Sequence, residues 1–223
     1  MATITIGILG LGRFGRAVAQ ELSTFDCEVI VIDKNQENVE WIEPYVTQAI
    51  QGDIRDFDFL ENIGMANCDV AVVATGDSLE SSVLGIMNCK KLGINSIVAK
   101  AQDKDYRDVL VAIGANTVIQ PEKEMGKRVA KSLLRRHITD MVELDENYAV
   151  VEFFPPKTWI GETIETLDLR KRYEINIIGL RNKDDGKLDV SFGPDHQVQA
   201  DDIFVGIAES DKIERYDYLN KLR

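Results

Sequence analysis

Residues 4–15 read Ile-Thr-Ile-Gly-Ile-Leu-Gly-Leu-Gly-Arg-Phe-Gly, an apolar run that passes directly into a G-x-G-x-x-G loop. In such a loop Gly10 allows a tight turn, Gly12 lets the backbone approach a phosphate, and Gly15 lets the next helix pack on the strand. The helix that follows directs free N–H groups at the anion. The stretch therefore predicts the first strand, phosphate loop and helix of a nucleotide-binding unit.

A second apolar run supports this interpretation, because glycines alone also mark ordinary tight turns. Val29-Ile30-Val31-Ile32 ends in Asp33, at roughly the 20-residue spacing expected of an acid that hydrogen-bonds a ribose hydroxyl. The glycine loop and this acid together predict nucleotide binding.

Further strand-like runs alternate with helical patterns up to about residue 120. These runs are Ala49-Ile50, Val70 to Ala74, Ile97-Val98-Ala99 and Thr117-Val118-Ile119. Strands so apolar are buried on both faces, which is typical of a parallel sheet covered by helices. We therefore predict an α/β fold, a Rossmann-like doubly wound sheet of six strands. Ligands of such sheets bind at the carboxyl ends of the strands.

Pro121, followed by the acidic turn Glu122-Lys123-Glu124, predicts a helix start. This helix would carry an apolar stripe that can cover its own sheet or that of a neighbour. The stripe consists of Met125, Val129, Leu133 and Leu134. The opposite face carries the basic residues Lys127, Arg128, Lys131, Arg135 and Arg136. We assign residues 1–138, including this crossover helix, to the first domain.

Residues 139–223 change pattern and predict a small α+β module. Its expected strands are Tyr148 to Phe154, Ile175 to Leu180, Leu188 to Phe192 and Ile203 to Ile207. A short helix is expected from Glu162 to Leu169 and a polar helix from Asp211 to the end. A module of this size has a thin core, so we expect it to dimerise through an apolar surface.

Composition excludes several functions. The formal net charge of −12 disfavours binding to a phosphate backbone, so nucleic acid is not an expected partner. No apolar stretch approaches the roughly 18 residues that span a bilayer, and we expect a soluble chain that is not exported. Cys27, Cys68 and Cys89 are widely spaced and lack a C-x-x-C pair, so they predict neither a disulfide framework nor a zinc site.

The sequence offers no evident reaction machinery. His137 ends a basic helix and His196 lies in a loop beside Asp195, and neither is placed where a catalytic pair would be expected. Motifs of serine hydrolases, zinc proteases and P-loop enzymes are missing from the sequence. Nucleotide binding without catalytic residues indicates a sensor rather than an enzyme.

The chain resembles the RCK family (regulators of potassium conductance), in the form of the soluble gating subunit of Ktr- and Trk-type bacterial potassium transporters. The resemblance covers essentially the whole chain. It is carried by Arg13 inside the glycine loop, by the segment Lys100-Ala101-Gln102 and by residues 119–126, Ile-Gln-Pro-Glu-Lys-Glu-Met-Gly. The chain has one such unit where other members have two in tandem, which favours the Ktr type.

The resemblance implies a cytoplasmic octameric ring of dimers, held at the inner face of the membrane by a potassium-translocating subunit. ATP and ADP, or NAD(H) in some members, would occupy the glycine-loop site and set different ring shapes. Arg13 would reach the terminal phosphate, and Glu122 would help hold a divalent cation, Mg²⁺ or Ca²⁺, beside the γ-phosphate. The nucleotide-binding residues so implied are Gly10, Gly12, Arg13, Phe14, Gly15, Asp33 (ribose), Lys34, Asp53 and Ile54 (adenine), Thr75, Gly76, Asp77, Lys100, Ala101, Gln102 and Glu122.

The C-terminal module resembles domains that bind cyclic di-AMP at a dimer interface in many Gram-positive relatives. The residues implied for this second ligand are Arg170, Ile175, Asn176, Ile177, Phe192 and Pro194. The alternative is that they form only the core and the dimer contact of the module.

Two other functions compete with a gating subunit. The glycine loop alone would allow an NAD(P)(H)-binding oxidoreductase or an NAD(H)-sensing regulator. A redox-sensing repressor would need a basic DNA-reading module, which the acidic charge and the strand-rich C-terminal part disfavour. The physiological nucleotide, the cation, the direction of gating and the membrane partner stay open.

Overall fold

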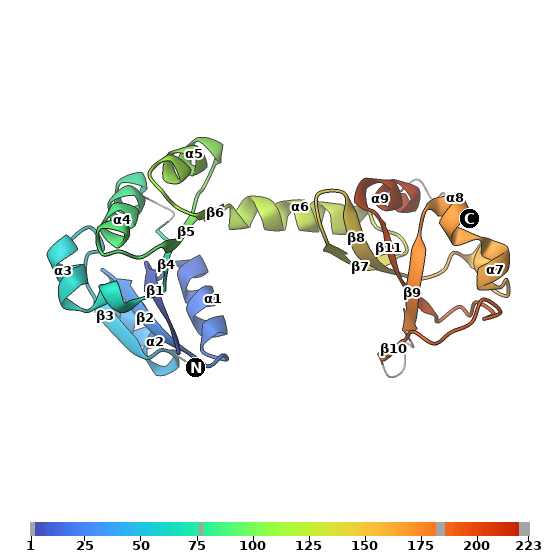
Figure 1. Ribbon diagram of the computed structural model, residues 1–223, viewed down its shortest axis with the longest axis horizontal. Coiled ribbons are helices and arrows are strands. Elements are labelled where there is room, and N and C mark those ends of the chain that lie inside the picture. The colour runs from blue at the N-terminus through green and yellow to red at the C-terminus, as the bar shows by residue number, and fades with distance from the viewer. Residues whose placement is uncertain (1–2, 76–77, 182–185, 219–223) are drawn as a thin grey trace. The chain divides into compact units, whose positions relative to one another are not determined.

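The computed structural model describes residues 3–75, 78–181 and 186–218. The chain forms two compact units, Met1–Gly126 and Lys127–Arg223 (Figure 1). The division between them falls within helix α6 (Pro121–Leu134), whereas the boundary predicted from the sequence assigns the whole of this helix to the first domain.

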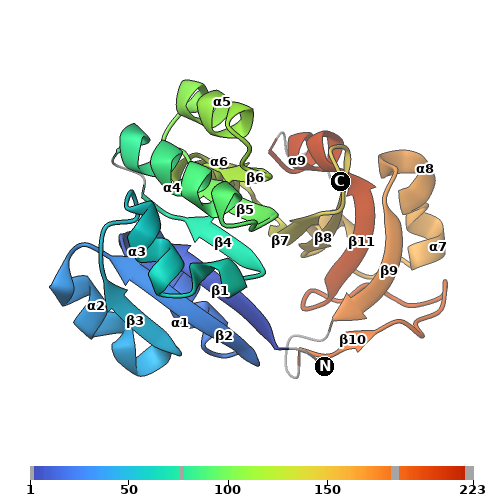
Figure 2. The ribbon, with the colours of Figure 1, turned by 60° about the vertical axis from the view of Figure 1, so that its left-hand side comes forward.

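The first unit is built on a parallel sheet of six strands in the order β3-β2-β1-β4-β5-β6 (Figure 2). Its strands are β1 (Ile4–Leu9), β2 (Cys27–Asp33), β3 (Gln48–Gln51), β4 (Val70–Val73), β5 (Ser96–Lys100) and β6 (Thr117–Ile119). Its helices are α1 (Arg13–Leu22), α2 (Gln36–Ile42), α3 (Phe57–Asn62), α4 (Leu79–Lys91) and α5 (Lys104–Ala112), with short 3₁₀ turns at Glu43–Tyr45 and Met65–Asn67. The predicted doubly wound Rossmann-like sheet is confirmed.

Each face of this sheet has its own core, because side chains alternate along a strand. Ile8 and Val31 pack with Ala19 of α1 and Val39 of α2. The neighbouring positions Leu9 and Ile32 point the other way and belong to a second cluster with α3, α4 and α5. Strands covered on both faces must be apolar throughout, which is why their runs could be recognised in the sequence.

Between β1 and β4 the strand order reverses direction, since β2 and β3 extend to one side and β5 and β6 to the other. Ligands of open α/β sheets bind at such a switch point, beyond the carboxyl ends of the strands. The glycine loop follows β1 at this place, so the fold itself puts the predicted phosphate loop at the switch point.

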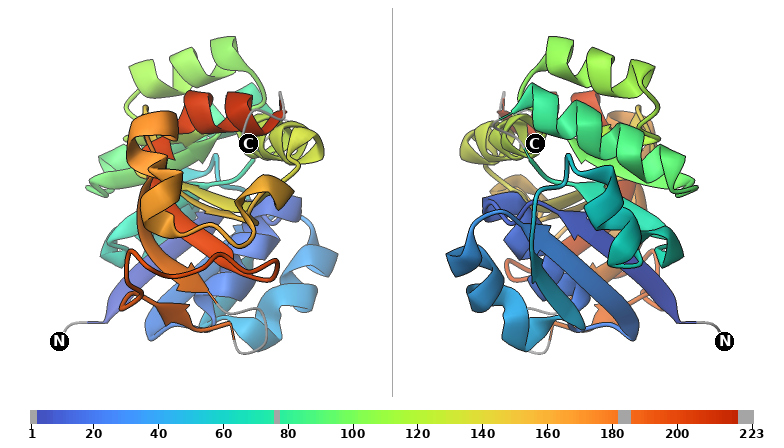
Figure 3. Two further views of the ribbon diagram at one scale, coloured as in Figure 1. Left: turned by 90° about the vertical axis from the view of Figure 1, so that its right-hand side faces the viewer. Right: turned by 90° about the vertical axis from the view of Figure 1, so that its left-hand side faces the viewer.

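The second unit is an antiparallel sheet of five strands in the order β10-β9-β11-β8-β7, flanked by short helices (Figure 3). Its strands are β7 (Ile138–Glu143), β8 (Tyr148–Phe153), β9 (Asn176–Arg181), β10 (Leu188–Asp189) and β11 (Ile203–Glu209). Its helices are α7 (Ile164–Leu167), α8 (Leu169–Tyr173) and α9 (Ser210–Tyr218), with a 3₁₀ turn at Lys157–Trp159. A predicted α+β module is confirmed.

Aromatic side chains fill the core of the second unit. Trp159 is 1% exposed and meets the rings of Phe153 and Phe204 edge-on, with centroids 6.1 Å apart in both pairs. Phe153 and Phe204 stack on adjacent strands at 5.5 Å. Large rings bury much area per residue, which lets a small module form a stable core.

Three local predictions in this unit were wrong. Strand β7 was not predicted, because its burial repeats every three residues rather than every two, with only Ile138 and Met141 buried. The helix expected from Glu162 to Leu169 is two short helices, separated by Asp168 in the left-handed conformation at φ 43°. The strand expected from Leu188 to Phe192 is limited to the edge pair Leu188–Asp189.

Helix α6 has the predicted amphipathic pattern, but no residue of it is buried within the described chain. Leu133 is 79% exposed and Met125, Val129 and Leu134 are each about half exposed. The helix ends at Leu134, so Arg135 and Arg136 lie beyond it rather than on its basic face. No helix among the described residues has the length and apolar character needed to cross a membrane.

The three cysteines are free thiols, and two of them, Cys68 and Cys89, are buried in the core of the first unit. Burial raises the pKa of Cys68 to about 11 and that of Cys89 to about 12. Both thiols therefore stay protonated near neutral pH, which makes them poor nucleophiles and poor metal ligands.

Candidate functional site

The glycine loop is shaped by close packing of its own backbone. Gly10 adopts φ 100°, a conformation that side chains disfavour, and its N–H donates to the carbonyl of Ile32 at 2.8 Å. A Cβ atom on Gly15 would collide with the carbonyl oxygen of Gly10, so helix α1 packs against the loop only because residue 15 is glycine. These two glycines therefore set the geometry of the loop.

Gly12 has a different reason to be glycine. It is the N-cap of α1 in an extended conformation that any residue can adopt, and a Cβ built there meets no described atom within 4 Å. The described residues thus leave open space beside Gly12, at the end of α1 where free N–H groups attract an anion. This is the place expected of a phosphate.

The next two residues of the loop, Arg13 and Phe14, differ in their exposure to solvent. Arg13 is exposed at the first position of α1 and has no ion-pair partner among the described residues. Phe14 is partly buried and packs against the core shared with α1 and α2. Arg13 can therefore reach an anion, whereas the side chain of Phe14 supports the loop.

Asp33 joins strand β2 to the glycine loop. Its Oδ2 accepts from the backbone N–H of Leu11 at 2.5 Å, and its Oδ1 accepts from the N–H of Asn35 at 2.8 Å and from Asn38 Nδ2 at 3.2 Å. Carboxylate oxygens offer several lone pairs, so these bonds leave room for ribose hydroxyl donors. Asp33 thus has a structural role in holding the loop as well as the position expected of a ribose ligand.

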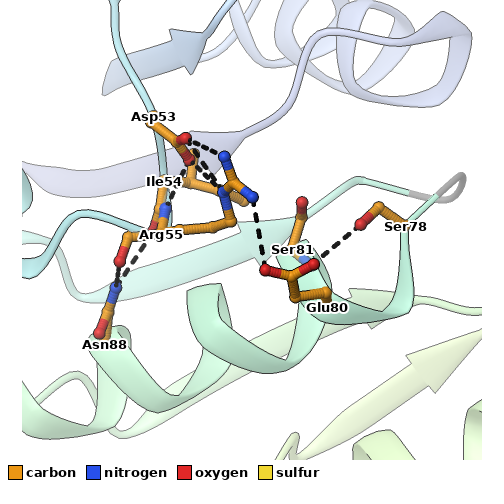
Figure 4. A network of polar contacts seen from close by, with 7 residues as sticks. All are labelled: Asp53, Ile54, Arg55, Ser78, Glu80, Ser81 and Asn88. Atoms are coloured by element: carbon orange, nitrogen blue, oxygen red, sulfur yellow. Dashed lines mark hydrogen bonds and ion pairs between the residues drawn. The ribbon is translucent and has the colours of Figure 1, made fainter.

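Asp53 follows β3 and is held by Arg55, which also reaches Glu80 of helix α4 (Figure 4). The Arg55 guanidinium lies 2.6 Å from Asp53 Oδ2 and 3.4 Å from Glu80 Oε1. Its hydrogen bonds to Asp53 hold the pKa of that carboxyl below its usual range. Nearby Lys34 is exposed, and its charge acts in the same direction.

Ile54 does not present its side chain to a ligand. It is 5% exposed and belongs to the core with α3 and α4, and its carbonyl accepts from Asn88 Nδ2 at 3.1 Å (Figure 4). Any contact of Ile54 with an adenine would therefore come from its backbone.

Thr75 follows β4 and lies directly against the glycine loop. A Cβ on Gly10 would come within 2.7 Å of Thr75 Cγ2. The Thr75 hydroxyl lies 3.0 Å from that of Ser82, which donates to the Thr75 carbonyl at 2.6 Å. The predicted ligands Gly76 and Asp77 lie outside the described residues.

Lys100 and Glu122 form an ion pair between the end of β5 and the first turn of α6. Lys100 Nζ donates to Glu122 Oε1 at 2.6 Å, and this bond lowers the pKa of the Glu122 carboxyl. Between them in sequence, Ala101 is fully buried and its N–H donates to the carbonyl of Ile119 at 2.9 Å, while Gln102 is exposed.

The residues present do not by themselves build a metal site. The described chain contains no group of three acidic, histidine or cysteine side chains that could share an ion. The Glu122 side chain is 70% exposed and already forms an ion pair with the Lys100 ammonium. A divalent cation at Glu122 would therefore need most of its oxygen ligands from elsewhere, such as the phosphates of a nucleotide.

The residues predicted for a second ligand lie at a cavity of about 360 Å³ within the C-terminal unit. Five of the six residues predicted for it line this cavity, namely Arg170, Ile175, Asn176, Ile177 and Phe192. Pro194 adjoins it, because its carbonyl accepts from the N–H of the lining residue Glu165 at 3.0 Å. Sequence reasoning missed Glu165 and Asp168, which also line the cavity. They lie in α7 and at the break between α7 and α8.

Both histidines lie in the second unit and bond to aspartates. His137 Nδ1 lies 2.9 Å from Asp217 Oδ1, and His196 Nε2 lies 2.8 Å from Asp202 Oδ2. Neither belongs to the unit that carries the glycine loop. Sequence reasoning also missed Arg55 and Glu80, which are exposed charges with no motif of their own.

The fold and the loop geometry define a nucleotide-binding Rossmann domain followed by an antiparallel module. The TrkA-N domain family matches residues 6–121. The Ktr system potassium uptake protein C of Bacillus subtilis (strain 168) is 32% identical over 211 residues, which cover 94% of this chain and 94% of that protein. The Ktr system potassium uptake protein A of the same organism is 30% identical over 94% of each. The chain belongs to the TrkA-N family and to the family of Ktr system potassium uptake proteins.

Solved structures agree on the fold. The GsuK RCK domain superposes with a TM-score of 0.61 at 18% identity, covering 98% of this chain and 48% of that one. A GsuK channel bound to NAD superposes with a TM-score of 0.62 at 16% identity, covering 97% and 40%. This chain thus spans about half the length or less of the GsuK chains that it matches.

Proposed function

We propose that the chain is a nucleotide-sensing regulatory subunit that gates a Ktr- or Trk-type potassium transporter. The observation that carries this proposal is the open space at Gly12, framed by the carboxyl ends of β1, β2 and β4 in a chain similar over nearly its whole length to Ktr proteins. ATP or ADP would bind with phosphates at the glycine loop and ribose at Asp33. The protein would act in the cytoplasm, as an octameric ring attached to its membrane partner.

Gating requires that two nucleotides favour different ring shapes. A ligand shifts a conformational equilibrium only by the difference between its affinities for the two states. ATP has a γ-phosphate that ADP lacks, and a cation would bridge this phosphate to Glu122. These added charges would supply the difference in affinity between the two ring shapes. Glu122 would then exchange the Lys100 ammonium for the cation at the first turn of α6, the helix that leads into the second unit.

NAD(H) is the alternative occupant of the same loop, as a sensed ligand or a cofactor. One structural neighbour, the GsuK channel, was solved bound to NAD. In this chain the histidines are paired to aspartates in the other unit, which favours sensing over hydride transfer.

Arg13→Ala tests the triphosphate sensor. Arg13 is an exposed cation at the start of α1 with no ion-pair partner in the described part of the chain, and its fixed fork suits a terminal phosphate. We expect the variant to weaken ATP binding about tenfold while ADP binding changes less than about threefold. Calorimetry with both nucleotides and with adenosine measures this, and equal losses for ATP and ADP would sink the assigned role.

We further propose that the C-terminal cavity binds cyclic di-AMP. The cavity combines one cationic side chain, Arg170, with apolar walls from Ile175, Ile177 and Phe192 and the amide of Asn176. Two carboxylates, Glu165 and Asp168, also line it, and Asp168 is paired with Lys171 at 3.2 Å. An arginine can pair with a phosphate while apolar side chains cover a base. Its volume of about 360 Å³ leaves such a dinucleotide partly outside one chain, which fits a site completed by a second copy.

Arg170→Ala should reduce cyclic di-AMP affinity about tenfold or more, because a charge-assisted bond to phosphate is lost. Lys157→Ala is the matched control, since Lys157 is an exposed cation of the same unit and does not line the cavity. Calorimetric titration of wild type and both variants with cyclic di-AMP measures the three affinities. Equal affinity of wild type and Arg170→Ala, or no binding by wild type, would leave these residues a purely structural role.

A further inference from the structure

Helix α9 carries a buried carboxylate that the proposed function does not use. Asp217 is fully buried and accepts from the backbone N–H of Arg136 at 2.7 Å and of His137 at 2.9 Å, with a longer contact of 3.5 Å to Ile138. The His137 ring adds a bond of 2.9 Å from Nδ1. Burying a charged carboxylate is costly unless it is fully bonded, and here four groups satisfy it.

A second carboxylate on the same helix makes ion pairs with the end of α6. Glu214 lies one turn before Asp217, so both project from the same side of α9. Its oxygens lie 3.1 Å from Lys131 Nζ and 3.2 Å from Arg135 Nη2. Arg135 and Glu214 are both less than one-fifth exposed, so solvent weakens their pair less than it weakens a surface pair.

These contacts converge on one short segment, residues 131–138, where α6 ends and strand β7 begins. A carboxylate bonded to successive backbone N–H groups fixes the path of the chain as well as its side chains. Helix α9 is itself anchored by Ile213, which is 1% exposed in the core of the second unit. The end of α6 is thus clamped to the C-terminal unit by Glu214 and Asp217, which we call the α9 clamp.

The other end of α6 is attached to the nucleotide unit. Glu122 in its first turn pairs with Lys100, and Glu124 accepts from the N–H of Gln120 at 3.1 Å. One continuous helix is therefore held at its start by Lys100, at the end of β5, and at its end by the α9 clamp.

We infer that Glu214 and Asp217 are positioning residues that transmit the nucleotide state to the C-terminal unit by holding the end of α6. This inference rests on the proposed function, because it needs ATP and ADP to set different positions of α6. Without the clamp, the start of α6 would still respond to the nucleotide, but the movement would be absorbed at residues 135–138.

Hydrogen exchange followed by mass spectrometry on the full assembled chain tests the inference, in the absence of ligand and with ATP or ADP. The variants are Asp217→Asn and Glu214→Gln. Asp211→Asn is the matched control, because it removes the same charge from an exposed position of the same helix. Far-UV circular dichroism checks that each variant folds. If Asp217→Asn does not fold, the exchange measured for Glu214→Gln is used to test whether the clamp transmits the nucleotide state.

In Asp217→Asn we expect the amides of residues 136–138 to exchange about tenfold faster, because their acceptor is impaired. The Kd values for ATP and ADP should stay within about twofold, while the ATP–ADP difference in exchange across β7, β8 and β11 disappears. Glu214→Gln should reduce that difference, and Asp211→Asn should retain it.

Two results contradict different claims. If Asp217→Asn frees residues 136–138 but keeps the full ATP–ADP difference in the C-terminal unit, the clamp does not transmit and the inference is wrong. If wild type shows no ATP–ADP difference anywhere in that unit, the proposed function fails, and the inference fails with it.

Discussion

Gly12→Ala is expected to lower the affinity for ATP, ADP and NADH at least about thirtyfold, or about 2 kcal/mol, while the fold stays intact. The added methyl group meets no described protein atom within 4 Å, and the backbone of Gly12 already has a conformation open to alanine. The methyl group would therefore occupy only the space assigned to the phosphates. Calorimetry measures the affinity, and thermal unfolding should show a change within about 1 kcal/mol.

Gly15→Ala is the matched comparison, since it adds the same methyl group three residues later. There the methyl group would overlap the carbonyl of Gly10, so β1 and α1 must separate at a cost of about 1 to 3 kcal/mol in the free energy of unfolding. One variant should thus lose binding alone and the other both binding and stability. Undiminished nucleotide binding by Gly12→Ala would show that the open space at residue 12 is not the ligand site.

Asp33→Ala is expected to weaken ATP, ADP and NADH about a hundredfold and by similar factors. Each of these ligands has a ribose, and the carboxylate also holds the N–H of Leu11 in the glycine loop at 2.5 Å. Losing the charged acceptor of the Leu11 and Asn35 N–H groups should lower the free energy of unfolding by about 2 kcal/mol as well. Calorimetry with each ligand and denaturant unfolding measure the two effects.

Asp26→Ala controls for the loss of a negative charge, because Asp26 is exposed just before the other end of the same strand β2. Its nucleotide affinities should match those of wild type. If Asp33→Ala weakened ATP but left NADH unchanged, the ribose assignment would fail, because both ligands carry a ribose.

The first unit could be predicted almost completely, because its strands are buried on both faces. Runs such as Val70 to Val73 are apolar without interruption, and no other arrangement buries them as well as a covered parallel sheet does. The glycine loop added the position of the ligand site. Here local pattern and tertiary structure agree, which is the condition under which sequence reasoning succeeds.

The second unit was predicted less well, because its short elements depend on contacts far away in sequence. Strand β7 has one buried residue in three, so no alternation indicated it, and among the described strands it pairs only with β8. The break at Asp168 needs a left-handed conformation at a residue other than glycine, which no local pattern predicts. The cavity residues were nevertheless named through the family resemblance and not through periodicity.

Side-chain partners were the hardest to predict. The pairing of Lys100 with Glu122 joins residues 22 apart, and that of Asp217 with the backbone of Arg136 joins residues 81 apart. Charged residues on amphipathic helices are usually solvated, so no local pattern singled out Asp217. Asp217 is buried because α9 packs against the start of β7, a contact between segments far apart in sequence.

Calorimetric titration of the purified full chain with ATP, ADP, NADH and cyclic di-AMP, with the mass of the assembly recorded in each state, tests the central claim most directly. We expect ATP and ADP to bind at one site per chain in an octamer without turnover, and cyclic di-AMP to bind at a separate site. Binding of NAD(P)H alone to a smaller oligomer, with oxidation of the cofactor by a carbonyl substrate, would contradict the gating role and indicate an oxidoreductase.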